Sequence, residues 1–201
     1  MEIIVLAIVS YLFGAVPFGL LVARSRGVDI RSKGSGNIGA TNVFRVIGKG
    51  WGIFTFVLDA LKGFIPAFFF PVVGNLAGDW GVLFGMVAII GHSFPVYLKF
   101  KGGKGVATSA GMLLGVAPLA VGIGFLCWVL CMVISRYVSL SSIIAAVAVA
   151  IVVWIQGDKG LVVNIALTLL AVLVVWLHRA NIKRLLNGTE NRFGKKKEAK
   201  S

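Results

Sequence analysis

Hydrophobic residues along this chain gather in long runs, and short polar stretches separate one run from the next. The runs cover residues 3–23, 51–73, 80–98, 106–135, 138–155 and 161–177. Most of them reach or approach the roughly 20 residues that a helix needs to cross a bilayer. They are too continuous for the alternating strands of a membrane barrel. The pattern therefore predicts an all-α polytopic membrane protein, organised as a single domain over residues 1–201.

Composition agrees with this pattern, because hydrophobic residues make up 58% of the chain, against about 45–50% in soluble domains. The first run follows Glu2 rather than basic residues and is longer than a signal core. We therefore expect a membrane span there and not a cleavable signal. Cys127 and Cys131 lie inside an apolar run, where we expect reduced packing residues.

Charge is concentrated beside the predicted spans. The formal net charge is +13, and residues 24–50, 99–105 and 178–201 hold 17 of the 20 Lys and Arg. Because basic residues mark the cytoplasmic side of a membrane, we expect all three stretches inside, the N-terminus outside and the tail 178–201 cytoplasmic. The tail's lysines at 195–197 have a simpler alternative role in setting topology and touching anionic lipid. Nucleic acid binding is excluded by this placement against the membrane.

Topology limits the number of spans. If the second basic stretch and the tail both lie inside, an even number of crossings must separate them, whereas a simple count gives three. Residues 106–135 either bend at Pro118 into two short helices or enter and leave the membrane on one side. The first alternative gives about seven helices, some short or broken, and the second gives five. We favour seven.

The stretch 33–49, KGSGNIGATNVFRVIGK, is the most polar part of the first half of the chain. It combines glycines with short polar side chains and one guanidinium, at Gly34, Ser35, Gly36, Asn37, Thr41 and Arg45. Free backbone N–H groups beside such donors are typical of an oxyanion site. Residues 40–47 predict a short helix that Gly48 terminates, with Asn42 and Arg45 on one face.

A second stretch, 91–105, reads GHSFPVYLKFKGGKG. Gly102, Gly103 and Gly105 expose backbone around Lys104, so the stretch is a second candidate anion site. The alternative is a flexible basic turn that only obeys the topology rule. His92, before a serine and a proline, is more typical of a packed or capping histidine.

The third stretch begins where the last run ends. His178 and Asn181 are three residues apart on a helix that we expect to continue out of the span, so they face the same way. Glu190 lies downstream among basic residues and is expected to hold the tail by ion pairing. Ser142, at the inner end of its span, is placed beside these stretches by the topology alone.

Several familiar motifs fail on context. Residues 34–39 fit G-x-G-x-x-G, but no βαβ unit surrounds them, and KGGKGVAT lacks the Ser or Thr that a Walker A loop needs. The two histidines are far apart and no carboxylate cluster accompanies them, so no metal site is predicted. Asp59 and Lys62 share one face of a predicted span, either as a functional pair or as a self-satisfied ion pair.

The three polar stretches resemble the signature motifs of the bacterial membrane glycerol-3-phosphate acyltransferases that use acyl phosphate, the PlsY family. The matching segments are SKGSGNIGATNVFRVIGKG, GHSFPVYLKFKGGKGVATSAG and HRANIKRLLNGTENRFG. They occur in the family's order, and the resemblance covers essentially the whole chain. The chain also lacks the H-x-x-x-x-D box of the thioester-dependent enzymes, because Tyr97 follows His92 and Lys183 follows His178 at that spacing.

The resemblance implies transfer of a fatty acyl group from acyl phosphate to the sn-1 hydroxyl of glycerol 3-phosphate. The products are lysophosphatidic acid and phosphate, in the first step of phospholipid synthesis. It also implies a bacterial inner-membrane location with the active site at the cytoplasmic face. The sequence shows no need for a cofactor, a metal or an obligatory protein partner, while membrane lipid surrounds the chain.

The same resemblance assigns residues to roles. The catalytic positions it implies are Ser35, Arg45, Lys104, His178 and Asn181, with Glu190 structural. The second-motif glycines belong with glycerol phosphate. The other expected phosphate-binding positions come from the residues and not from the resemblance: Gly34, Gly36, Asn37 and Thr41 from the chemistry of the first stretch, and Ser142 from the topology.

Two other classes of function remain open on sequence alone. A small transporter for a phosphorylated solute would suit Asp59 and Lys62 inside a span. A transporter of this kind is expected to show a two-fold internal repeat, and we find none between the halves. A scaffold that anchors lipid enzymes would leave the glycine-rich stretches without a purpose.

Overall fold

The structure is a computed structural model and describes residues 2–194. Helices make up all the regular elements of this part of the chain. In order they are α1 (Glu2–Ala15), α2 (Phe18–Ser25), η1 (Ile30–Ser32), α3 (Ala40–Val46), α4 (Lys49–Val73), α5 (Trp80–Ser93), η2 (Val96–Leu98), α6 (Val106–Val116), α7 (Pro118–Ser135), α8 (Val138–Gln156), α9 (Leu161–Leu177) and α10 (Arg179–Leu186). The predicted all-α class is confirmed. The lysines at 195–197 lie outside the described residues.

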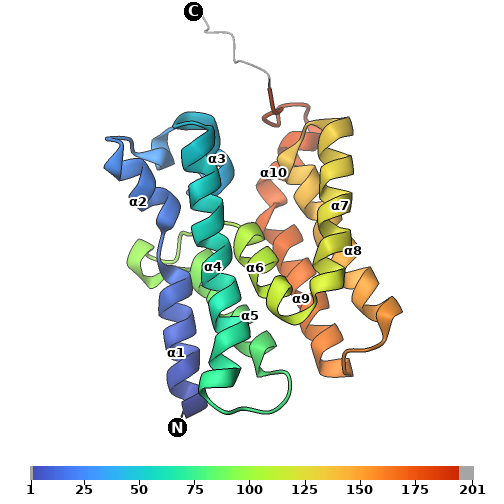
Figure 1. The fold of residues 1–201 in the computed structure, drawn as a ribbon. Coiled ribbons are helices and arrows are strands. Elements are labelled where there is room, and N and C mark those ends of the chain that lie inside the picture. The colour runs from blue at the N-terminus through green and yellow to red at the C-terminus, as the bar shows by residue number, and fades with distance from the viewer. Residues whose placement is uncertain (1, 195–201) are drawn as a thin grey trace, which may run out of the picture.

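The long helices lie side by side along one axis, as Figure 1 shows. The N-terminus and the α4–α5 turn lie at one end, and α2, α3 and α10 lie toward the other, which we call the polar end. Large apolar side chains cover the outside of the bundle, with Ile134 and Val162 each 80% exposed. Such a surface is stable in lipid and not in water, so the molecule is an integral membrane protein.

Five helical segments in the described part are long and apolar enough to cross a membrane, and six if the bent pair α9–α10 counts as one span. The five begin with α1 and α2 taken together and continue with α4, α5, α7 and α8. Residues 106–135 do bend at Pro118, but the resulting helix α6 has only 11 residues. The favoured bend is therefore present, but α6 is too short to count as a span, so by length and composition the count is five or six and not the expected seven, and the alternative number of five fits.

Two bends in these helices have local causes. The first hydrophobic run is broken at Val16 and Pro17, between α1 and α2, because proline lacks the N–H that would continue the helix and disfavours helical backbone before it. The last run ends at His178, where α10 departs at 54° to α9. The helix expected to continue straight through His178 therefore bends there instead.

Glycines bring helices of the first half into close contact. A Cβ at Gly63 on α4 would lie 1.9 Å from the Thr108 carbonyl oxygen, and one at Gly111 on α6 would lie 1.8 Å from that of Ala60. Small residues of this kind let helix backbones approach one another in membranes. The backbones of α4 and α6 are therefore in close contact within the bundle.

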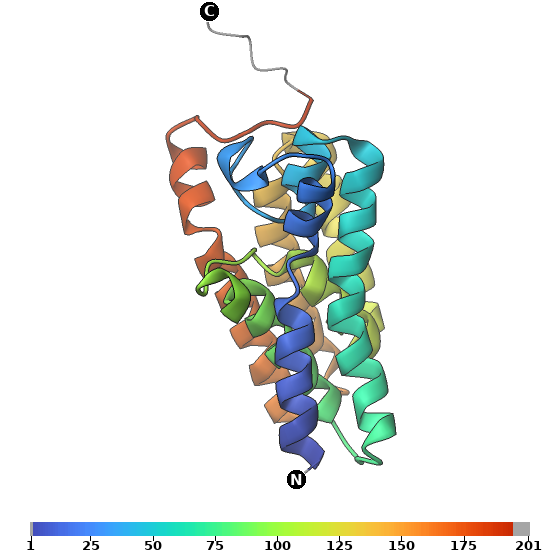
Figure 2. The same cartoon turned by 90° about the vertical axis from the view of Figure 1, so that its left-hand side faces the viewer.

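A small hydrophobic core lies at the polar end. It consists of buried side chains from α2, η1, α3 and the loop before α3, at Leu20, Val22, Ala23, Ile30, Ile38 and Val43. This core packs the first polar stretch onto α2. The connection from α5 to α6 instead crosses the molecule about halfway along its long axis, as Figure 2 shows. This connection, which carries the second polar stretch, therefore lies below the level of α2 and α3.

Candidate active site

The loop before α3 wraps around the side chain of Asn42, which is 1% exposed. Its Oδ1 accepts a hydrogen bond of 2.9 Å from the backbone N–H of Ser35. Its amide nitrogen lies within hydrogen-bond distance of three carbonyl oxygens, those of Ile30, Lys33 and Asn37. One buried amide therefore replaces the backbone pairing that secondary structure would supply.

The glycines of this loop are required by its shape. Gly34 and Gly36 have φ of +63° and +72°, a left-handed conformation that favours glycine. A Cβ at Gly34 would lie 2.2 Å from Asn42 Oδ1. Asn42 and Arg45 lie one turn apart on the helix α3, as expected, but they differ in role, because Asn42 is buried as a scaffold while Arg45 is exposed. Ser35 is likewise exposed.

The third polar stretch is organised by the Glu190 carboxylate, whose side chain is 6% exposed. It accepts hydrogen bonds from the Ser139 hydroxyl at 2.8 Å, the Asn181 amide at 2.6 Å and Arg184 Nε at 2.7 Å. Burial by itself would raise the pKa of Glu190, but these three donors outweigh it and lower the pKa. The carboxylate is therefore ionised at neutral pH and fixes Asn181 in one orientation.

Lys104 meets this network from the second stretch. Its Nζ donates a hydrogen bond to Asn181 Oδ1. The backbone N–H groups of Gly102 and Gly103 donate to the carbonyl oxygens of Ser93 and His92, each at 3.1 Å, so the loop is tied to the end of α5. The second stretch is therefore a loop held by backbone hydrogen bonds, and not the flexible basic turn given above as the alternative.

The surroundings of Lys104 also change its pKa. Burial lowers the pKa of its ammonium group to about 8; the Glu190 carboxylate opposes this shift, and Arg184 and Arg45 reinforce it. Arg45 keeps much of its surface exposed, yet desolvation by nearby protein lowers the pKa of its guanidinium, and Glu190 opposes that change. The cationic groups of all three stretches therefore act on one another, as close neighbours do.

His178 lies at the bend between α9 and α10 and is 2% exposed. Its Nδ1 is 2.8 Å from the carbonyl oxygen of Val174. A carbonyl oxygen can only accept, so in the neutral ring Nδ1 carries the hydrogen and Nε2 keeps a free lone pair. The bend thus fixes both the tautomer and the direction of a candidate base.

Aromatic packing joins the first stretch to the third. The rings of Phe44 on α3 and Phe193 are 5.4 Å apart between centroids. The Phe193 N–H donates to the Arg136 carbonyl oxygen at 2.8 Å, in the turn between α7 and α8. With the Lys104–Asn181 bond, this packing brings the three polar stretches together.

Other expected residues are placed less directly. Ser142 is buried on α8, one turn beyond Ser139, and its hydroxyl donates to the Val138 carbonyl oxygen at 2.8 Å and accepts from Trp128 Nε1 at 3.3 Å. Asn37 caps its own loop, because its Oδ1 accepts from the Gly39 N–H at 2.8 Å. Gly105 begins α6 with φ of +73°. Thr41 is half-buried in the first turn of α3.

Sequence reasoning did not single out Ser139, Arg184 or Phe193, and it did not foresee the scaffold role of Asn42. The helical spacing of Ser139 to Ser142 and of Asn181 to Arg184 was a usable signal, because each pair lies one turn apart. No sequence signal marks Phe193. Among residues 2–194, no group of three or more His, Cys, Asp and Glu side chains is arranged to hold a metal ion.

The apolar outer surface and the recessed polar site define an integral membrane protein whose polar groups converge from three separate stretches. Comparison with known proteins identifies the family of this membrane protein. The sequence model of the glycerol-3-phosphate acyltransferase family matches residues 4–188. The chain belongs to this family.

Individual relatives agree along the whole length. The glycerol-3-phosphate acyltransferase of Geotalea daltonii is 47% identical over 190 residues, which cover 94% of this chain and 97% of that protein. The enzyme of the same name from Aquifex aeolicus is 43% identical and covers 96% and 100%. The crystal structure of PlsY in its glycerol 3-phosphate form has a TM-score of 0.91 at 40% identity, with 96% of both chains covered. Its lysophosphatidic acid form has a TM-score of 0.87.

Proposed function

We propose that this membrane-bound glycerol-3-phosphate acyltransferase takes its acyl group from acyl phosphate and transfers it to the sn-1 hydroxyl of glycerol 3-phosphate. The products are lysophosphatidic acid and phosphate. The observation that carries the proposal is the meeting of three anion-binding stretches around the contact of Lys104 with Asn181. Both substrates carry a phosphate and one carries an alkyl chain, which suits a polar site recessed within an apolar bundle.

Binding roles follow from the groups present. Lys104 and Arg45 bind the phosphates and stabilise charge on the departing one. The Ser35 hydroxyl and the backbone N–H groups of the loop around Asn42 hold a phosphate or the carbonyl oxyanion. Glu190 orients the Asn181 amide, and Asn181 in turn holds the Lys104 ammonium group where it can bind a phosphate. The protein thereby positions two anions that would otherwise repel each other.

The reaction itself is a simple displacement. The glycerol hydroxyl oxygen attacks the carbonyl carbon, the bond from that carbon to the phosphate oxygen breaks, and phosphate leaves with the electron pair. The hydroxyl proton goes to His178 Nε2 or to an oxygen of the leaving phosphate. An acyl phosphate is already activated, so the second route needs no protein base.

The site is proposed to face the cytoplasm of a bacterial inner membrane, with the N-terminus outside. The basic residues of the polar end support this orientation, because positive charge beside spans stays inside. A sided reporter fused to the C-terminus tests it directly. A reporter active only outside the cell would reverse the proposed orientation.

The experiment that tests the reaction uses purified protein in detergent or lipid mesophase. Palmitoyl phosphate and glycerol 3-phosphate are supplied, and phosphate release and lysophosphatidic acid are followed together. We expect release to need both substrates and to fall at least a hundredfold in Arg45→Ala. If glycerol 3-phosphate is acylated from an acyl thioester while acyl phosphate of any chain length stays intact, the proposed donor is wrong.

Parallel variants separate the proton routes. If His178 Nε2 takes the proton, His178→Ala loses most of kcat with little change in KM. Turnover that survives in His178→Ala assigns the proton to the leaving phosphate. Asp158→Asn, in the turn between α8 and α9, removes a charge far from the polar end and is the matched control.

A further inference from the structure

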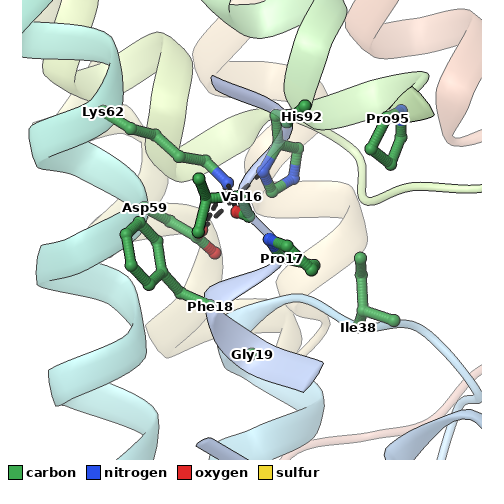
Figure 3. A pocket seen from close by; sticks show the side chains of 10 residues that line it. Val16, Pro17, Phe18, Gly19, Ile38, Asp59, Lys62, His92 and Pro95 are labelled. Atoms are coloured by element: carbon green, nitrogen blue, oxygen red, sulfur yellow. Dashed lines mark hydrogen bonds and ion pairs between the residues drawn. The ribbon is translucent and has the colours of Figure 1, made fainter. Parts of the chain in front are cut away.

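A buried ionic cluster lies between α4, α5 and the break in the first span, as Figure 3 shows. Asp59 and Lys62 stand one turn apart on α4 and are 2% and 0% exposed. Lys62 Nζ lies 2.8 Å from Asp59 Oδ1. Burying two charges in a membrane protein is costly unless the pair is held in place by further contacts. Those further contacts reach two loops. We call the loop before α3, in the first polar stretch, the first motif loop, and the connection from α5 to α6, in the second polar stretch, the second motif loop.

Lys62 reaches across to the break between α1 and α2. Its Nζ donates a hydrogen bond of 2.8 Å to the carbonyl oxygen of Val16, the residue before Pro17. It also lies 5.5 Å from the centre of the Phe18 ring, within range of a cation–π contact. The ammonium group therefore caps a helix end that Pro17 leaves open.

α2, whose direction is set at this break, carries the first motif loop. A Cβ at Gly19 would lie 1.9 Å from the carbonyl oxygen of Ile38, so α2 and the loop are in direct backbone contact. Ile38 also lines the narrow cavity around the cluster. Any change in the angle between α1 and α2 is therefore passed to the loop that presents Ser35.

The opposite side of the cluster contacts the second motif loop. His92 Nδ1 lies 3.8 Å from Asp59 Oδ1, and the His92 carbonyl oxygen accepts from the Gly103 N–H at 3.1 Å. A Cβ at Gly103 would lie 2.1 Å from His92 Nε2, so the Nε2 edge of the imidazole packs against the backbone of the residue that precedes Lys104. The position of the second motif loop relative to α5 therefore depends on the position of the His92 side chain.

We propose that Asp59, Lys62 and His92 are positioning residues, which fix the first motif loop and Lys104 at a set distance from each other. Lys62 holds the α1–α2 break, Asp59 neutralises Lys62 and faces His92, and His92 supports Gly103. The cluster is thus more than a self-satisfied ion pair. It also does not serve as a solute site, because the cavity around it has no room for a water molecule.

The test rests on the proposed acyl transfer reaction. It compares two ways of removing charge from the Asp59–Lys62 pair. Asp59→Leu with Lys62→Met keeps the approximate shape of both side chains and removes both charges, a change that buried pairs often tolerate without loss of stability. Asp59→Asn removes one charge and leaves the buried Lys62 ammonium group without its counter-ion, which should destabilise the fold. The control, Asp158→Asn with Lys159→Gln, removes a 3.6 Å pair from the turn between α8 and α9.

We expect the apolar double variant to fold but to lose about tenfold to a hundredfold in kcat/KM, the cost typical of reacting groups misplaced by about 1 Å. KM for glycerol 3-phosphate should rise as well as kcat fall. The control pair should keep kcat/KM within about threefold of the wild type, and Asp59→Asn should unfold at a lower temperature than the double variant, because it leaves the Lys62 charge buried without a partner. A folded double variant with unchanged kcat and KM overturns the proposal.

If the double variant fails to fold, a second comparison decides. Gly103→Ala should lose activity because its methyl group meets the His92 ring, and His92→Ala with Gly103→Ala should recover part of it. No recovery overturns the positioning role of His92 and with it the proposal. Failure of the wild type to use acyl phosphate is a separate result. It contradicts the proposed acyl donor and not the positioning role of the cluster.

Discussion

Glu190→Gln is the most informative single change, because it keeps the shape of the side chain and removes only its charge. The glutamine amide nitrogen cannot accept a hydrogen bond, so at least one of the three donors at Glu190 loses its acceptor. Because Arg184 is 36% exposed, the loss of its bond is screened by solvent. We expect the free energy of unfolding to fall by about 1–2 kcal/mol.

The same change acts on Lys104. Two hydrogen bonds and the Asn181 amide separate the Glu190 carboxylate from Lys104 Nζ, a path of about 7 Å at ordinary bond lengths. Opposite charges at about 7 Å attract by about 0.6 kcal/mol in water and about 2.4 kcal/mol at an effective dielectric constant of about 20. Without that attraction the pKa of Lys104 falls below its value of about 8.

The assay is the pH profile of kcat/KM for glycerol 3-phosphate. In Glu190→Gln we expect the alkaline limb to move to lower pH by about one pH unit, since about 1.4 kcal/mol changes an ionisation equilibrium tenfold. Asp158→Asn, which removes a distant charge, should leave the limb in place. An alkaline limb that stays in place in Glu190→Gln, in a folded variant, would refute the coupling of Glu190 to Lys104.

Further predictions test the scaffold and the site. In the wild type, KM for glycerol 3-phosphate should rise as pH passes about 8, because Lys104 loses its proton there and with it the attraction for phosphate; Lys104→Arg should shift this rise to higher pH. Asn42→Ala should lower the free energy of unfolding by about 2–3 kcal/mol, measured by thermal melting, because it leaves buried loop groups unpaired. Gly111→Ala should cost about 1–3 kcal/mol by forcing α4 and α6 apart, whereas Gly122→Ala, with open space around it, should cost nothing.

The fold was largely predictable because lipid imposes a simple rule on sequence. The runs 51–73 and 161–177 end within two residues of α4 and α9, since only continuous apolar helices satisfy their backbone there. The break at Val16 and Pro17 was not predicted, although the proline is visible. The carbonyl oxygen at this break accepts a hydrogen bond from Lys62, which is 46 residues away, and no local pattern reports such a contact.

The candidate site was predictable in its parts and not in its assembly. Glycines at 34 and 36 and the basic residues Arg45 and Lys104 stand out by residue type. Asn181 meeting Lys104, across 77 residues, and Ser139 meeting Glu190, across 51 residues, follow from how the helices pack. The orientation in the membrane and the roles of individual residues stay predictions, to be decided by the experiments above.

The connection between α5 and α6 crosses the molecule halfway along its length, and this depth has an energetic consequence for a lipid substrate. Pulling an alkyl chain of about 16 carbons out of hydrocarbon would cost about 12 kcal/mol, at about 0.8 kcal/mol for each methylene. In the proposed reaction, the lysine on this connection meets the phosphate end of acyl phosphate while the tail of that substrate stays dissolved in the bilayer. The membrane then serves as the solvent of one reactant, and only the small polar reactant has to leave water.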